Sequence, residues 1–118
     1  MPIQATIDNF SGPGTVKLWT WAHLVTGTPD GSPMQWAEFA DRSVFISGTF
    51  GTGTCKIEGS NDGVTWQTIH DTSNTAISTT ANTIRQALEV TKFVRPNVTG
   101  ADGTTDLTVS MCVRRNWV

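Results

Sequence analysis

Short alternating runs of apolar and polar residues, interrupted by Gly, Asn, Asp or Pro, extend through most of this sequence. The clearest run lies near the end of the chain, where single Thr, Ser or Cys residues separate Leu107, Val109, Met111 and Val113. A period of two places alternate side chains on opposite faces of a β-strand. The sequence therefore predicts an all-β protein with seven or eight strands, each burying one face.

The turn residues indicate where the strands begin and end. Asn61-Asp62-Gly63 is the strongest turn signal, because all three residues accept left-handed backbone angles, and it predicts a hairpin with Trp66 packed beneath it. The segment 71–83 is expected to be a long loop or an irregular edge strand, and 84–89 at most a turn of helix. Pro96 is expected to end a strand. The predicted strands cover 15–25, 34–40, 42–50, 54–60, 64–70, 92–97 and 104–115.

One apolar face per strand is typical of an antiparallel sandwich whose outer faces are hydrated. A length of 118 residues suits one domain. We therefore expect a single-domain antiparallel β-sandwich, jelly-roll-like, formed by residues 15–118. Residues 1–14 are expected to form an extended N-terminal arm, or a short edge strand, that ends in a turn.

Composition argues against several classes of protein. Eight Lys and Arg against ten Asp and Glu give a net charge of −2, without the basic surface that nucleic-acid binding needs. The sequence contains no apolar run of the ~20 residues that a membrane span requires. Residues 1–4 do not resemble a secretory signal, so we expect synthesis in a cytoplasm. There Cys55 and Cys112 are expected to be free thiols, although a bridge between them stays open.

Chemistry-bearing residues are scattered. His23 and His70 lie outside any zinc-binding pattern, and a hydrolase or metal enzyme would need the fold to bring them together. Asp62, Asp102 and Asp106 lie in turns without the spacing of a calcium loop. The sequence has no nucleophile elbow and no phosphate-binding glycine loop. We therefore expect no enzyme activity, no catalytic residues, no metal and no cofactor.

The tryptophans leave two interpretations open. Trp19 and Trp21 share one strand face, opposite Val16 and Leu18, and Trp36 follows on the next predicted strand. Either these rings are buried because both sides of a central strand are covered, or they face a partner, since aromatic residues are enriched in interfaces and sugar-binding platforms. Trp117, beside the last residue, is a candidate for docking on another subunit.

From Asp41 onwards the sequence resembles a family of small virion proteins of tailed bacteriophages that decorate, or cement, the capsid. The resemblance covers about two-thirds of the chain and is carried by residues 41–44, 48–51, 57–63 with Trp66, 94–100 and 102–109. It implies a non-enzymatic structural protein that is located on the capsid surface of the virion. The implied partners are the major capsid protein and further copies of this chain, as a dimer or trimer.

A decoration protein needs an inert β-domain and surfaces that contact neighbouring subunits. The segment 2–13 or the loop 26–33 is the hypothesised capsid contact, with tryptophans at contacts between copies. Arg42, Arg95, Arg114 and Arg115 are candidate ion-pair partners, although Arg95 has Asp41 and Glu58 as partners within its own fold. The candidate interface residues are Pro2, Ile3, Ile7, Phe10, Trp19, Trp21, Trp36, Arg114 and Trp117.

A second resemblance supports an alternative function. The hairpin at 59–66 and the following segment Phe93-Val94-Arg95-Pro96 resemble discoidin-like jelly rolls, many of which bind carbohydrates or lipid headgroups. The cysteine pair typical of discoidin domains is absent from this sequence. The alternative is a carbohydrate-binding sandwich displayed on the virion, with Trp19, Trp21 or Trp36 as the stacking platform.

Overall fold

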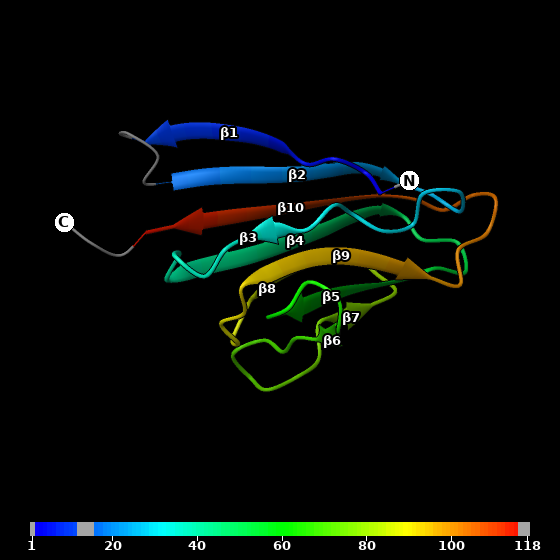
Figure 1. Ribbon diagram of the computed structural model, residues 1–118. Coiled ribbons are helices and arrows are strands. Elements are labelled where there is room, and N and C mark those ends of the chain that lie inside the picture. Colours follow the sequence, from blue (N-terminus) through cyan, green and yellow to red (C-terminus); the bar gives the residue numbers. More distant parts are fainter. Residues whose placement is uncertain (1, 12–15, 116–118) are drawn as a thin grey trace.

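Two antiparallel sheets pack face to face in the computed structural model, which describes residues 2–11 and 16–115 (Figure 1). The first sheet has the order β1 (Thr6–Ser11), β2 (Val16–Leu24), β10 (Asp106–Arg114), β4 (Asp41–Thr49) and β8 (Thr83–Gln86). The second has the order β3 (Met34–Gln35), β9 (Phe93–Thr99), β5 (Thr54–Ser60) and β6 (Gln67–Thr68), while β7 (Ser78–Thr79) also pairs with β5. The prediction of an all-β, single-domain antiparallel sandwich is confirmed.

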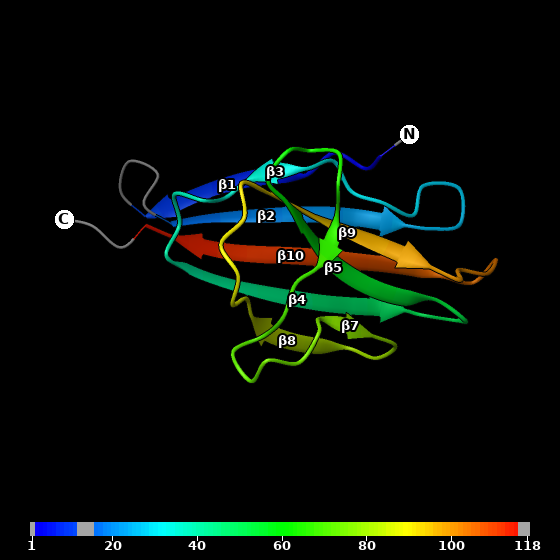
Figure 2. The ribbon, with the colours of Figure 1, turned by 60° about the horizontal axis from the view of Figure 1, so that its bottom comes forward.

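The core lies between the sheets and follows the predicted alternation. On β10, which occupies the centre of the first sheet, Leu107, Val109, Met111 and Val113 all face inwards and are fully buried. Neighbouring β4 contributes alternate residues in the same way, and Cys55 and Ile57 face them from β5. Figure 2 shows the second sheet in front of the first, so the outer face of the first sheet is turned away from the viewer.

Three of the four tryptophans of the predicted interface are core residues. Trp19 is 2% exposed, and Trp21 and Trp36 are completely buried. Trp19 packs edge-to-face on Phe39, with 5.5 Å between the ring centroids. The placement of these rings at a surface contact is therefore corrected: the tryptophan side of β2 is its inner side, which the second sheet covers.

Four local predictions also need correction. The segment 84–89, expected to contain a helical turn, begins with the last residues of strand β8, because residues 83–86 pair with residues 43–46 of β4. The predicted strands at 34–40 and 64–70 shrink to the two-residue strands β3 and β6. Trp66 is half-buried and lies outside the core, with the Arg95 guanidinium 4.2 Å from its ring centroid.

Strand β9 continues through Pro96, where the sequence predicted an end. A residue's N–H and C=O point to the same edge of its strand, and the Pro96 carbonyl accepts a hydrogen bond from the Gly31 amide at 2.9 Å. The missing N–H of Pro96 therefore faces the loop before β3. The pairing of β9 with β5 on the other side loses no hydrogen bond, so the proline is tolerated.

The N-terminal segment belongs to the sandwich along its described length. Residues 6–11 form edge strand β1 and pair with residues 16–20 of β2. The edge-strand interpretation therefore describes residues 6–11 better than that of a separate arm. The predicted boundary at residue 14 falls within 12–15, outside the described residues. Within the described part of the chain, no helix is long and apolar enough to cross a membrane.

Candidate interaction surfaces

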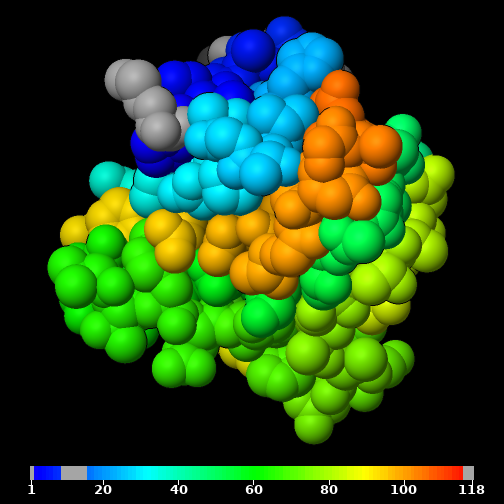
Figure 3. All heavy atoms as spheres, turned by 90° about the vertical axis from the view of Figure 1, so that its right-hand side faces the viewer, coloured from blue at the N-terminus to red at the C-terminus, as the bar shows by residue number. Residues whose placement is uncertain are grey.

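The two segments hypothesised to contact a capsid form one surface. The Ile3 amide donates a hydrogen bond to the Asp30 carbonyl at 3.0 Å, and the Ser32 amide donates to the Ile3 carbonyl at 2.7 Å. Gln4 adds a side-chain hydrogen bond from Nε2 to Ser32 Oγ at 2.9 Å. We call residues 2–5 together with 26–33 the composite surface. Figure 3 shows the blue N-terminal residues, the light-blue and cyan loop and the orange segment near residue 100 lying side by side.

The composite surface is fixed directly to the core. Trp21 Nε1 donates a hydrogen bond to the Ser32 carbonyl at 3.0 Å, so a buried ring holds the loop. A Cβ on Gly31 would lie 2.6 Å from the Trp21 ring and 2.7 Å from Pro96, so only glycine permits this close approach. The Thr26 hydroxyl donates to the Asp102 carbonyl at 2.6 Å and attaches the start of the loop. The composite surface is therefore preformed, and residues 2–5 are not a free arm.

Charges around the composite surface are largely paired. Asp30 lies 4.0 Å from Arg95, whose Nε donates to Glu58 at 3.0 Å. The prediction that Arg95 pairs within its own fold is confirmed for Glu58. The Arg95 guanidinium also covers Trp66, so this ring is not a free platform for stacking on a sugar. The surface therefore offers polar backbone and small side chains rather than a strong local charge.

The outer face of the first sheet carries a second candidate surface. Phe45 on β4 and Ile84 on β8 are direct partners across the strands, and they are 50% and 66% exposed. Leu18 on β2 and Cys112 on β10 are also direct partners, and Cys112 is exposed. We call these outward residues the outer band: Leu18, Phe45, Ile84 and Cys112.

An open hollow of about 420 Å³ adjoins the outer band. Its lining includes Cys112 of the band, Ser43 beside it, and Val16. Arg114, a predicted interface residue, borders the hollow and donates from Nε to Asp41 at 2.9 Å. The ion pair closes one end of the hollow without leaving a net charge there.

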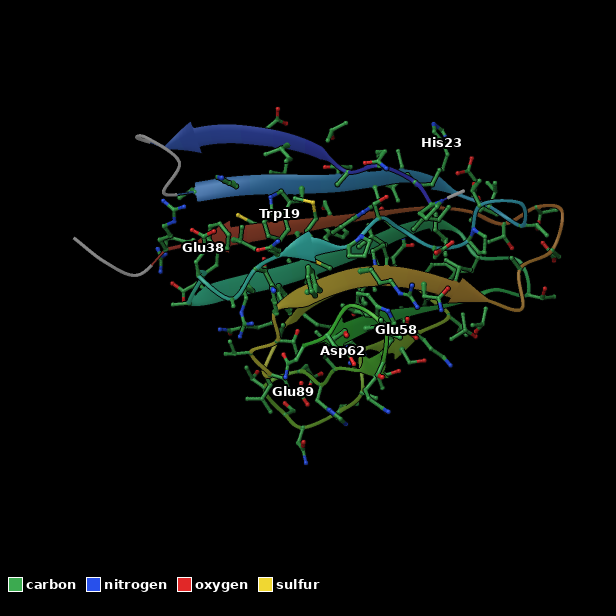
Figure 4. The ribbon with its side chains drawn as sticks, in the orientation of Figure 1. Trp19, His23, Glu38, Glu58, Asp62 and Glu89 are labelled. Carbon is green, nitrogen blue, oxygen red and sulfur yellow. The ribbon has the colours of Figure 1, made fainter. Side chains whose placement is uncertain are left out.

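The potentially catalytic side chains are dispersed over the molecule. His23 Nδ1 lies 3.3 Å from Asp106, whereas His70 Nδ1 lies 2.5 Å from Glu89. Figure 4 places His23 and Glu89 on opposite sides of the molecule, so the fold does not bring the two histidines together. Among residues 2–11 and 16–115, no group of three His, Cys, Asp or Glu side chains is placed to hold a metal ion.

The turn aspartates have a structural explanation. Asp62 accepts hydrogen bonds from the amides of Thr65 and Val64, and Ser60 donates a third, which lowers the pKa of Asp62 to about 2. The hydroxyl and amide of Thr104, with the Thr52 amide, lower the pKa of Asp102 to about 2. Both carboxylates are ionised acceptors that organise their turns, as sequence reasoning favoured over calcium binding.

The remaining predicted interface residues divide into three groups. Pro2 and Ile7 are exposed and Ile3 is partly buried, with Ile7 on the edge strand. Arg114 lies on the outer face. Trp117 and the side chain of Phe10 lie outside the described residues.

Sequence reasoning missed the outer band. The sequence did contain a signal for it. Phe45 alternates with the inward residues Val44 and Ile46 and so points outwards, although the next outward positions on the strand hold only Ser and Thr. Ile84 was hidden by the helix-like composition of the residues after it. Recognising the pair required the β4–β8 register, which the sequence does not reveal.

Comparison with known proteins identifies a related fold. No family model and no curated protein sequence matches the chain. Among solved structures, the chain is similar to the SPBc2 prophage-derived protein YomS, with a TM-score of 0.60 and 17% sequence identity. The match covers 83% of this chain and 93% of that protein. At this identity the likeness shows a shared fold.

Proposed function

We propose that this protein is a non-enzymatic structural protein of a phage virion that binds the outer surface of the capsid and stabilises the shell. The observation that carries this proposal is the composite surface, in which two segments far apart in sequence are joined and held on the core by Trp21. A preformed surface loses little conformational entropy when it docks. The shared fold with a prophage-derived protein supports a phage setting.

Shell stabilisation follows from many weak contacts acting together. Each copy needs only a modest affinity, because a decorated shell presents its sites in a fixed array and a copy that spans two subunits links them. The near-neutral composite surface fits a contact made through backbone groups and shape. The protein then stabilises the shell by linking capsid subunits, and its buried aromatic core keeps the domain rigid.

The experiment is co-sedimentation of the purified protein with expanded shells of the phage's major capsid protein. We expect saturable binding and a higher temperature of shell disruption. Gln4→Glu combined with Pro33→Glu adds charge to two exposed positions of the composite surface and should weaken binding at least tenfold. Val64→Ser, at an exposed residue outside the composite surface, is the matched control and should bind like the unmodified protein.

Two results would contradict the proposal. One is the absence of any binding to expanded shells at protein concentrations that saturate known decoration proteins. The other is binding that the Gln4 and Pro33 double variant leaves unchanged while its thermal unfolding remains normal, which would exclude the composite surface as the contact.

A further inference from the structure

The outer band forms one continuous apolar track across four strands. Phe45 is directly opposite Ile84 on one side and Ser110 on the other, and Cys112 follows Ser110 two positions along β10. Leu18 is directly opposite Cys112. Directly opposed residues share a face and diagonal neighbours are within reach of long side chains. The track therefore runs diagonally from β8 to β2.

The surroundings of the band are polar, and the charged side chains of the outer face lie at its edges: Asp8 on β1 is exposed and directly opposite Leu18, and the exposed Asp106 begins β10. Thr20 and Ser110 lie in one row with Phe45, and Ser43 and Gln86 lie in the row with Cys112. The Asp41–Arg114 pair neutralises the charges at one end. Between these edges, the central rows of the face on β2, β10, β4 and β8 carry no charged side chain, so two such centres can approach each other without like-charge repulsion.

We propose that the outer face of the first sheet packs against the same face of a second copy of this chain, around a two-fold axis. Such an interface is isologous, so every feature must be matched by a feature on the same face. The described part of the face meets this condition, because it carries a protruding ring, Phe45, and an adjoining hollow of about 420 Å³. In the dimer each Phe45 enters the hollow of the other copy.

The size of the face is sufficient for a dimer. Strands of 6, 9, 9, 9 and 4 residues, at about 3.3 Å per residue and about 4.8 Å between strands, give a flat area of roughly 600 Å². Accessible area exceeds flat area because side chains project from it, and stable interfaces bury about 600–1,000 Å² on each partner. Two such sheets would stack about 10 Å apart, as sheets do within sandwiches.

The first test is the mass of the protein in solution without capsids, measured by sedimentation equilibrium across a wide concentration range. We expect a monomer–dimer equilibrium, and Phe45→Ser and Ile84→Ser should each raise the dimer dissociation constant at least tenfold. Val64→Ser removes an even more exposed apolar side chain outside the face, and it should leave the equilibrium unchanged.

Cys112 provides an independent reporter at its native position. It is exposed, whereas Cys55 is buried and burial raises the pKa of its thiol to about 12, so a maleimide reacts with Cys112 first. We expect labelling of Cys112 to slow as protein concentration rises, and Phe45→Ser to abolish that dependence.

Any of three results overturns the proposal. The first is a monomer at every concentration. The second is a trimer, or a dimer that both variants leave intact. The third is a Cys112 thiol that only added capsid shells protect, which would assign the outer face to the capsid. Because the dimer forms without capsids, its failure and a failure of capsid binding are separate outcomes.

Discussion

The two faces of the first sheet are built from the same strands and differ in what covers them. On β2 and β4 the inward residues include Trp19, Trp21, Val44 and Ile46, all buried, whereas the outward Phe45 is half exposed. The two tryptophan rings of β2 are thus among the least accessible groups of the protein. The comparison teaches that the phase of a residue relative to the second sheet decides its role, and that side-chain size alone does not.

The largest contrast should come from truncating one ring on each face. Trp21→Ala removes a fully buried ring and its hydrogen bond to the composite surface, so we expect a loss of about 3–5 kcal/mol of unfolding free energy. Phe45→Ala, measured in dilute solution, should change stability by about 0.5 kcal/mol or less. Urea unfolding measures both values, and equal losses would show that the two faces are buried to the same extent.

A smaller effect should follow from crowding the inner side of the β4–β10 pair. Gly48 has a φ of 129°, and a Cβ there would lie 2.4 Å from the Asp106 carbonyl oxygen. We expect Gly48→Ala to cost about 2 kcal/mol in urea unfolding. Gly103→Ala is the control, since a Cβ at that position meets no atom within 4 Å. A Gly48 variant as stable as the control would show that β4 and β10 can shift apart at this position with little loss of stability.

The smallest effect should appear at the loops that join the strands, and acid should remove it. The pKa of Asp102 is about 2 in the folded protein, below its ordinary value of 3.8, so its ionised form stabilises the fold above about pH 4. That stabilisation is lost as pH falls from about 4 towards 2. Asp102→Asn should therefore be less stable than the unmodified protein at pH 6, and the difference should shrink at pH 2.

The same acid measurement on Asp62→Asn should give the same trend, because the pKa of Asp62 is also lowered to about 2. Urea midpoints at several pH values provide the readout. A difference that stays constant between pH 6 and pH 2 would show that the hydrogen bonds to these carboxylates do not distinguish the two ionisation states.

Local pattern predicted much of the fold. The strict alternation at 107–113 identified the inward face of β10, and the predicted strands 42–50 and 54–60 match β4 and β5 to within one residue at each end. The errors have a common physical cause. Residues 85 and 86 have helix-former composition but pair with β4, and Pro96 lies in a strand because its missing N–H faces a loop. In both cases the strand conformation depends on which neighbouring segment the residues pair with, and local composition does not reveal that partner.

The candidate surfaces were less predictable for the same reason. Segment 2–13 and loop 26–33 were each named as a contact, but the joining of residues 2–5 to the loop depends on a bridge between Ile3 and Gly31, which are far apart in the sequence. Whether an aromatic residue on a strand faced the core or a partner was undecided until the second sheet was placed over Trp19 and Trp21. Alternation separates two faces without saying which one is covered.

The central position of β10 has a consequence for biosynthesis. A ribosome makes β2 and β4 long before it makes the last strand in chain order, and yet each of them has β10 as its neighbour in the first sheet. Until that strand emerges, both carry unpaired backbone groups and apolar side chains that favour association with other chains. Closure of the sheet therefore waits until β10 has been made, and termination before β10 would leave an aggregation-prone fragment instead of a smaller stable protein.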